Sequence, residues 1–323
     1  MATASTTLQA KTKSLSPSRK SSYAWRQIKR SWQLYVFLAL PVAWLLVFMY
    51  YPMYGAQIAF RDFLPGRTIL GSEWVGLTNF TRFFNSPMFE RLLRNTIGLS
   101  FYSLLVGFPI PILIALSLNQ LRTGFFKRSV QMISYAPYFI STVVMVGLIL
   151  QFLDLRRGPI NLLFQALGLD TIHFMGIADM FPDIYVWSGV WQNSGFNTVI
   201  YMAALSTIDP ALHEAALVDG ANRLQRIWHI DIPGIIPITL TLLILNMGQL
   251  LNVGFEKAFL LQNPLNLKTS EVISTYVYKV GLVGGVSNFS YAAAIGLFNS
   301  VLGLLLLLAA NQLSKKFSET SLF

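Results

Sequence analysis

Six segments of this sequence are long and apolar enough to cross a lipid bilayer, which takes about 20 residues in a helix. Hydrophobic residues make up 54% of the chain and charged residues 12%, about half of the charge that soluble domains carry. The sequence therefore predicts an all-α integral membrane protein with about six transmembrane helices. The predicted spans are residues 34–54, 95–118, 129–151, 184–205, 234–255 and 290–311, of which the fourth is the least apolar.

The Lys and Arg residues divide unevenly between the two sides that six spans create. One side holds both ends of the chain and 14 of the 24 Lys and Arg residues, although its segments are shorter in total. Since positive residues concentrate on the cytoplasmic side of membrane proteins, this side is predicted to be cytoplasmic. The cytoplasmic segments are then 1–33, 119–128, 206–233 and 312–323, and the outer segments are 55–94, 152–183 and 256–289.

The first 33 residues are basic and contain no acidic residue. Trp25, Ile28 and Trp32 share one face at helical spacing, which is typical of a helix that lies on the membrane surface. A plain basic flank before the first span is an equal alternative. The net charge of +10 does not indicate nucleic acid binding, because most of the Lys and Arg residues lie in this tail or flank apolar segments. The predicted parts are a cytoplasmic tail over 1–33, a transmembrane domain over 34–311 and a C-terminal cytoplasmic tail over 312–323.

Two of the spans contain polar residues at helical spacing. Polar groups that face lipid are costly, so these side chains are expected to face a cavity or a neighbouring helix. Aromatic faces beside amides suit a passage for sugars, because rings stack on a pyranose and amides bond its hydroxyls; interface anchors and bonds between helices are the alternative. The fourth span has Trp187, Trp191, Gln192, Asn193 and Asn197. The fifth has Asn246, Gln249, Asn252 and Glu256, within an arc of about 120° on one helix.

The sequence offers no catalytic centre of its own. It has no cysteine, which excludes disulfides and thiolate chemistry. No phosphate-binding Gly-x-x-x-x-Gly-Lys-Ser/Thr sequence occurs, so nucleotide hydrolysis would need another subunit. His173, His213 and His229 lack the spacing of metal ligands. We therefore expect no metal and no cofactor in this chain.

A polar stretch interrupts the apolar sequence between the fourth and fifth spans. Asp209 is a good N-cap and Pro210 suits the first turn of a helix that is expected to end near Val218. Asp219–Gly220 is a strong turn signal, because glycine tolerates positive φ. A second amphipathic helix is predicted over 221–229, after which Pro233 is expected to begin the fifth span. The result is a helix–turn–helix elbow over residues 209–233 on the cytoplasmic side.

The elbow resembles a known family motif. Glu214-Ala215-Ala216 is followed after three residues by Gly220, and after nine more by Ile230 and then Ile232-Pro233. This frame is similar to the "EAA" motif of binding-protein-dependent ABC importer permeases, with Ile232 in place of the usual Leu. The resemblance extends to the polysaccharide-type sugar permeases and covers about 34–320. The segments that support it are 50–63, 71–84, 93–100 and 292–317.

The resemblance implies that the elbow is a coupling helix that docks on an ATPase subunit. It further implies two ATPase subunits that bind ATP and Mg, a second related permease, and a periplasmic or lipid-anchored solute-binding protein. The implied location is a bacterial cytoplasmic membrane, crossed several times, with both termini cytoplasmic. The residues expected at the ATPase contact are Glu214, Ala215, Ala216, Asp219, Gly220 and Arg223.

The substrate implied by the resemblance is an oligosaccharide or polysaccharide. The subgroup includes a permease of an alginate importer, and four outer-side arginines would suit such an acidic glycan. The same arginines would equally pair with Asp62, Asp154 or the binding protein. These arginines are Arg61, Arg67, Arg156 and Arg157.

Two other classes of protein stay open at this point. A secondary transporter driven by an ion gradient would explain the polar stripe of the fifth span, with Glu256 as a proton or cation site. The elbow and the lack of paired broken helices stand against it. An intramembrane enzyme is disfavoured, because no nucleophile–base pair or metal pair can be assembled.

Overall fold

The computed structural model describes residues 29–283 and 288–317 and divides the chain into two compact units, 1–57 and 58–323. The described part of the first unit is one helical run, which begins as α2 (Trp32–Leu45). It continues through a π-helix (Leu46–Tyr50), α3 (Tyr51–Met53) and a 3-10 helix (Tyr54–Phe60), whose residues from Ile58 on belong to the second unit. None of the side chains of α2 is buried within the chain, as expected of a helix surrounded by lipid or by another subunit. The predicted surface helix around Trp25 and Ile28 lies outside the described residues.

The second unit begins with a short hairpin and the second predicted span. Strands β1 (Arg61–Asp62) and β2 (Glu73–Trp74) are antiparallel, with Arg61 opposite Trp74. After α4 (Thr78–Phe84), the span is formed by α5 (Met88–Gly107) and α6 (Pro109–Asn119). Pro109 and Pro111 lack N–H donors, and the α-helix is interrupted at Phe108.

The third predicted span, 129–151, is not one continuous helix. Helix α7 (Phe125–Tyr135) and a 3-10 helix (Ala136–Phe139) are followed by α8 (Thr142–Phe152), which is bent from them by 100°. Pro137 lies in the 3-10 helix, Ile140 is extended, and the Ser141 hydroxyl then caps α8 by accepting from the Val144 N–H at 3.4 Å. A proline and a new N-cap therefore break an apolar stretch that reads as uniform.

The remaining elements extend the helical architecture to the end of the described chain. The elbow comprises α11 and α12, and a π-helix (Ile227–Asp231) joins α12 to α13. A further π-helix (Lys279–Val283) follows α16. The α-helices after α8 are α9 (Pro159–Ala166), α10 (Phe181–Leu205), α11 (Pro210–Val218), α12 (Arg223–Arg226), α13 (Ile232–Gly248), α14 (Phe255–Leu261), α15 (Leu267–Ser270), α16 (Ile273–Tyr278) and α17 (Phe289–Phe317).

Four helices in the described residues are long and apolar enough to span a membrane, and the bent pair α7–α8 would make a fifth. The predicted fourth span corresponds to α10, which has 25 residues but is less apolar. The all-α membrane fold is therefore confirmed, whereas the count of six spans stays a prediction. The four helices cover Trp32–Phe60, Met88–Asn119, Arg223–Gly248 and Phe289–Gln312.

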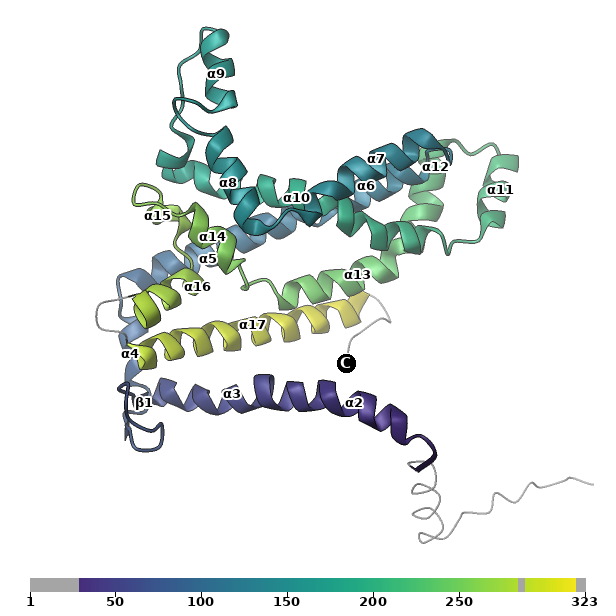
Figure 1. Ribbon diagram of the computed structural model, residues 1–323. Helices are drawn as coiled ribbons and strands as arrows, with labels where there is room; N and C mark the ends of the chain where they lie inside the picture. The colour runs from purple at the N-terminus through teal and green to yellow at the C-terminus, as the bar shows by residue number, and fades with distance from the viewer. Residues whose placement is uncertain (1–28, 284–287, 318–323) are drawn as a thin grey trace, which may run out of the picture. The chain divides into compact units, whose positions relative to one another are not determined.

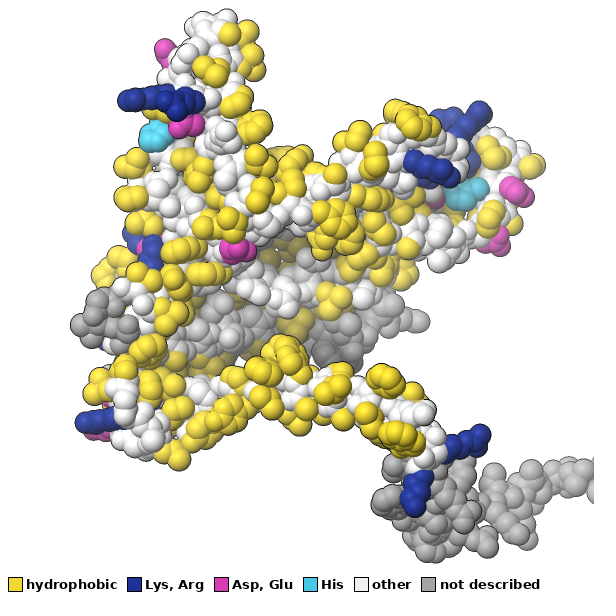
Figure 2. All heavy atoms as spheres, in the orientation of Figure 1, with side chains coloured by type: hydrophobic (Ala, Val, Ile, Leu, Met, Phe, Trp, Pro, Cys, Tyr) yellow, Lys and Arg dark blue, Asp and Glu magenta, His cyan; other side chains and the backbone are white. Residues whose placement is uncertain are grey.

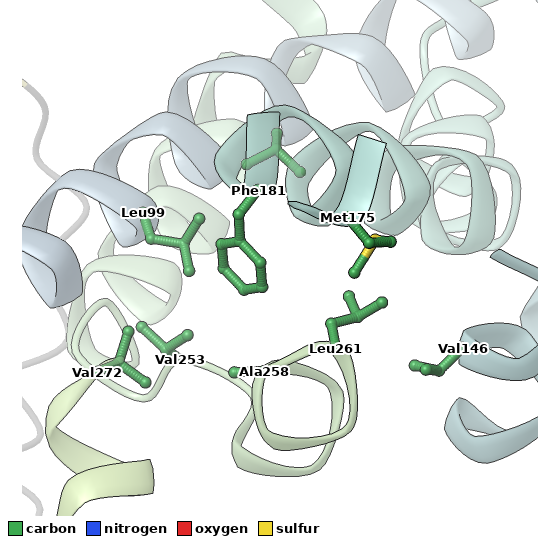
Figure 3. Close-up of a cluster of buried hydrophobic side chains, with 9 residues drawn as sticks. Leu99, Val146, Met175, Phe181, Val253, Ala258, Leu261 and Val272 are labelled. Atoms are coloured by element: carbon green, nitrogen blue, oxygen red, sulfur yellow. The ribbon is translucent and has the colours of Figure 1, made fainter. Parts of the chain in front are cut away.

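Helix α10 is the centre of the second unit, where it packs along α5 and α6, while α13 packs along α17 (Figure 1). The main hydrophobic cluster joins Leu99 of α5 and Phe181 of α10 to Ala258 and Leu261 of α14 (Figure 3). On the face shown in Figure 2, hydrophobic side chains cover much of the second unit, and Lys and Arg gather around α7 and α12. Such an apolar surface fits a membrane-embedded body.

Candidate functional site

A cavity of about 800 Å³ lies within the second unit. Its walls come from α5, α6, α10, α13, the break before α8, and the segment from Gln249 through α14. Hydroxyls and amides alternate with apolar side chains along these walls. The polar lining residues outside the tyrosines are Ser100, Ser103, Ser141, Thr142, Gln192, Asn193, Ser194, Asn197, Asn246, Gln249, Asn252 and Lys257.

Backbone contacts orient several of the amides in the cavity. Gln192 donates from Nε2 to the Ile140 carbonyl at 2.8 Å, and so connects α10 to the break before α8. Asn193 and Asn246 each donate to a carbonyl one turn earlier in their own helices, at 2.9 and 2.8 Å. An amide has two N–H donors and an acceptor oxygen, so one such bond holds the side chain without exhausting its capacity for a ligand.

The structure brings six of the nine predicted passage residues to this cavity: Gln192, Asn193, Asn197, Asn246, Gln249 and Asn252. The predicted tryptophans lie elsewhere. Trp187 and Trp191 are both about half exposed and do not line the cavity. Trp187 instead donates from Nε1 to the Tyr102 hydroxyl at 3.1 Å, and this hydroxyl donates to Asp183 at 2.7 Å. Tyrosines, including Tyr138 and Tyr185, supply the aromatic part of the lining.

The prediction that four polar residues form a stripe along a single helix of the fifth span is wrong. Helix α13 ends at Gly248, so Gln249 and Asn252 lie in the segment after the helix, where Asn252 donates to Gln249 at 3.2 Å. Glu256 lies in the first turn of the separate helix α14 and is not in the cavity wall.

Lys257 is a lining residue that the sequence reasoning did not select. Its side chain is buried, with 9% exposed, and its Nζ donates to the Tyr185 carbonyl at 2.7 Å. The ammonium also lies 4.6 Å from the centroid of the Tyr185 ring. Helix α14 lies outside the four apolar spans. Burial of the side chain lowers the pKa of Lys257 to about 8. The only sequence signal was a lysine in the apolar run of α14.

The elbow has the local structure that its sequence predicts. Asp209 caps α11 by accepting from the Ala211 N–H at 2.9 Å. At the other end, Gly220 has φ +78°, the Gly220 N–H bonds the Leu217 carbonyl at 3.1 Å and the Ala221 N–H bonds the Ala216 carbonyl at 2.8 Å. This pair of bonds is a Schellman motif, which closes the helix and requires a residue with positive φ.

The second half of the elbow differs from the prediction. Helix α12 begins at Arg223, after a capping box between Asn222 and Gln225. It does not end at His229, because the π-helix and α13 continue it without a break to Gly248. Pro233, which has no N–H to donate, lies two residues after the π-helix, and the helix continues through it. The predicted start of the fifth span at Pro233 is therefore wrong, since the elbow and the span share one helix.

A buried carboxylate joins α11 to the ends of two other helices. Asp231 is fully buried in the π-helix, and its Oδ1 lies 3.3 Å from Nε2 of His213 in α11. Gln120, just after α6, donates to Oδ2 at 3.1 Å, and Asn119 donates to Oδ1 at 3.4 Å. Sequence reasoning missed this cluster, because Asn119 and Gln120 lie 112 and 111 residues from Asp231 along the chain.

The outer-side arginines do not line the cavity. Arg61 donates to the carbonyls of Leu70 and Ser72 and lies over the Trp74 ring, so it holds the β1–β2 hairpin. The Asp154 carboxylate accepts from the backbone N–H groups of Arg157 and Arg156 at 2.7 and 3.0 Å. These two bonds lower the pKa of Asp154.

Comparison with known proteins agrees with this fold. Residues 107–319 match the family "binding-protein-dependent transport system inner membrane component". The chain belongs to this family. It is 43% identical over 290 residues to the polygalacturonan/rhamnogalacturonan transport system permease YteP of Bacillus subtilis, covering 90% of each chain. The family favours a binding-protein-dependent importer over a transporter driven by an ion gradient, and confirms the resemblance to ABC sugar permeases.

Two solved structures are similar along most of the chain. One is a bacterial ABC transporter involved in the import of the acidic polysaccharide alginate, with a TM-score of 0.84 and 40% identity. The similarity covers 92% of this chain and 99% of that one. The other is a bacterial alginate ABC transporter in complex with a periplasmic protein that holds an alginate pentasaccharide, with the same score, identity and coverage.

Proposed function

We propose that this chain is one permease subunit of an ABC importer that takes up oligosaccharides of an acidic polysaccharide. The relatives named above are transport proteins for polygalacturonan or alginate, both acidic polysaccharides. The observation that bears most on this proposal is the cavity of about 800 Å³, in which amides and hydroxyls from several helices converge. Its volume lies within the range of ligand sites, and its polar groups match the dense hydroxyls of a sugar.

The elbow is proposed as the docking site of the ATPase. Its surface exposes large apolar side chains, which are costly in water and are typical of an interface. The charged Glu214 and Arg223 are exposed beside them. The small side chains of Ala215 and Ala216 leave room for the backbone of another protein to approach closely. The exposed apolar residues of the elbow are Leu212, Leu217, Val218, Leu224 and Trp228.

The arrangement of the second unit supports the proposed orientation. The elbow lies at one end of this unit, and α9 and α15 lie at the other (Figure 1). The sequence predicts that the elbow is cytoplasmic and that α9 and α15 lie on the outer side, which agrees with their positions at opposite ends of this unit. On this proposal both termini are cytoplasmic, the binding protein docks at the α9 end, and the ATPase subunits bind ATP and Mg at the elbow end.

The structure offers a direct route for coupling. Because α12 and α13 form one helix with the π-helix between them, movement of the elbow is transmitted to a span that borders the cavity. Asp231 connects the same helix to α11 and to the end of α6. We propose that ATP-driven closure of two ATPase subunits shifts the elbow and, through these connections, opens the cavity alternately to each side, with a second related permease as the other wall.

Cross-linking tests the docking proposal directly. The chain has no cysteine, so Val218→Cys, at a position 88% exposed, places a single thiol on the elbow. We expect a short thiol–thiol cross-link to a matching cysteine in the partner ATPase. Leu169→Cys, at an exposed position near α9, is the matched control and should give none. Cross-linking from Leu169 but not from Val218 would overturn the proposed docking site.

A further inference from the structure

Lys257 differs from the other described residues of the cavity wall in carrying a charge. Among the described residues that line the cavity, it is the only one whose side chain is charged at neutral pH. The described ion pairs are Arg91–Glu271, His213–Asp231 and Lys279–Glu271, so no described carboxylate pairs with it. A buried ammonium without a counter-charge is costly, and an anion in the cavity would offset that cost.

The neighbouring helix is shaped to hold this ammonium at the cavity wall. The Tyr185 carbonyl accepts its hydrogen bond and the Tyr185 ring lies beside it. Gly189 is one turn further along α10, and a Cβ built there would lie 3.1 Å from Nζ. A glycine at this position therefore leaves the space that the ammonium occupies. A tyrosine carbonyl and a ring supply partial negative charge but no full counter-ion.

We propose that Lys257 determines the charge preference of the passage, by binding a carboxylate of the acidic oligosaccharide as it crosses the cavity. This inference rests on the proposed function, because it takes the cavity to be the saccharide passage. A single ammonium provides a weak contact that a moving ligand can leave, which transport requires. Gln192, Asn193 and Asn252 line the same cavity and would bond hydroxyls of the same sugar chain.

Two substitutions separate the charge of Lys257 from its structural contact. Lys257→Gln keeps an N–H donor for the Tyr185 carbonyl but removes the charge, whereas Lys257→Arg keeps the charge. The test uses the complete importer in proteoliposomes, with alginate oligosaccharides and with the same oligosaccharides after reduction of their carboxylates. The second readout is ATPase stimulation by the loaded binding protein, which reports docking and coupling without passage.

We expect Lys257→Gln to lower uptake of the acidic oligosaccharide about ten-fold, as one lost charge-assisted contact would. In Lys257→Gln, uptake of the carboxyl-reduced form and ATPase stimulation should stay within about two-fold of the unaltered importer. Uptake of the acidic form by Lys257→Arg should stay within the same limit. Equal losses in both variants, or equal loss for both probes, would overturn the proposal and leave Lys257 a structural residue. If the unaltered importer transports neither probe, the proposed function itself fails.

The pH profile provides a readout that a structural role would not change. Uptake of the acidic probe should fall as the pH rises through about 8, because the Lys257 amine, whose pKa burial lowers to about 8, then loses its proton. Lys257→Arg should remove this fall, and its persistence there would contradict the proposal. The titratable residues on the elements around α14 are Asp183, Tyr185 and Tyr201 of α10, and Tyr276 and Tyr278 of α16, whereas α8 has none and Glu256 is exposed.

Discussion

Nε2 of His213 lies 3.3 Å from Oδ1 of the fully buried Asp231, and this contact joins the exposed helix α11 to the long helix that enters the membrane. Gln120 and Asn119 bring the end of α6 to the same carboxylate. One side chain therefore connects α11 to two membrane helices. A buried carboxylate needs such partners, because an unpaired buried charge is strongly destabilising.

His213→Phe tests this connection, since it removes the contact and nearly preserves the size of the side chain. We expect uptake per ATP hydrolysed to fall several-fold and the stability to fall by about 1 kcal/mol, because Asp231 keeps its two amide partners. The measurements are coupled uptake and ATPase rates in proteoliposomes. His229→Phe is the matched control, because the ring of this exposed histidine hydrogen-bonds the Gln225 carbonyl of its own helix and forms no ion pair among the described residues. Equal effects at both positions would refute a special role for the His213–Asp231 contact.

Gly220→Val tests the turn that closes α11. The residue has φ +78° and open space around it, so the substitution costs backbone strain of about 1–2 kcal/mol without a clash. We expect the protein to insert but uptake to be uncoupled from ATP hydrolysis. Gly168→Val is the control, because Gly168 has φ +73° and equally open surroundings but lies after α9. Normal uptake by the Gly220 variant would count heavily against the elbow as the coupling element.

Gln249→Ala and Trp191→Ala together locate the passage. Gln249 lines the cavity, so its truncation should lower uptake while ATPase activity without substrate is unchanged. Trp191 lies outside the cavity, and its truncation should have the smaller effect on uptake. The reverse order would move the passage to the exposed face of α10 and restore the stacking role that the sequence predicts for its tryptophans.

The stability of the protein should depend on the protonation of Lys257. Burial lowers its pKa to about 8, below the value of 10.5 that it has when exposed. The folded state thus favours the neutral amine, so the contribution of Lys257 to the free energy of unfolding should rise between pH 8 and 10.5 and should be absent below that window. Thermal unfolding in detergent measures this as a midpoint that rises with pH relative to Lys257→Met. Parallel curves for the two proteins would show that the amine is not desolvated.

Local features of the sequence predicted the elbow and part of the cavity well. The Asp209 cap and the Gly220 turn depend on a few adjacent residues, so they could be identified without a tertiary structure. The amides of α10 also reached the cavity as expected, because polar groups in an apolar helix avoid lipid.

Features that depend on contacts between distant segments could not be predicted. The break before α8 lies within an apolar run, and the end of α13 at Gly248 places Asn252 and Glu256 off the helix that was to hold them. The choice between Glu256 and Lys257 as a cavity residue depends on the orientation of a separate short helix against α10. A proline after a polar stretch is typical of a helix start, but one helix passes through Pro233, so the elbow and the fifth span are continuous.

On the proposed function, ATP hydrolysis by a docked partner drives an acidic saccharide through this chain. Uptake of alginate oligosaccharides into proteoliposomes that contain the complete importer tests this proposal most directly, with ATP and ion gradients supplied separately. We expect uptake that requires ATP and the loaded binding protein and is unaffected when ion gradients are collapsed. Uptake that follows an imposed ion gradient without ATP would contradict it and would favour a secondary transporter.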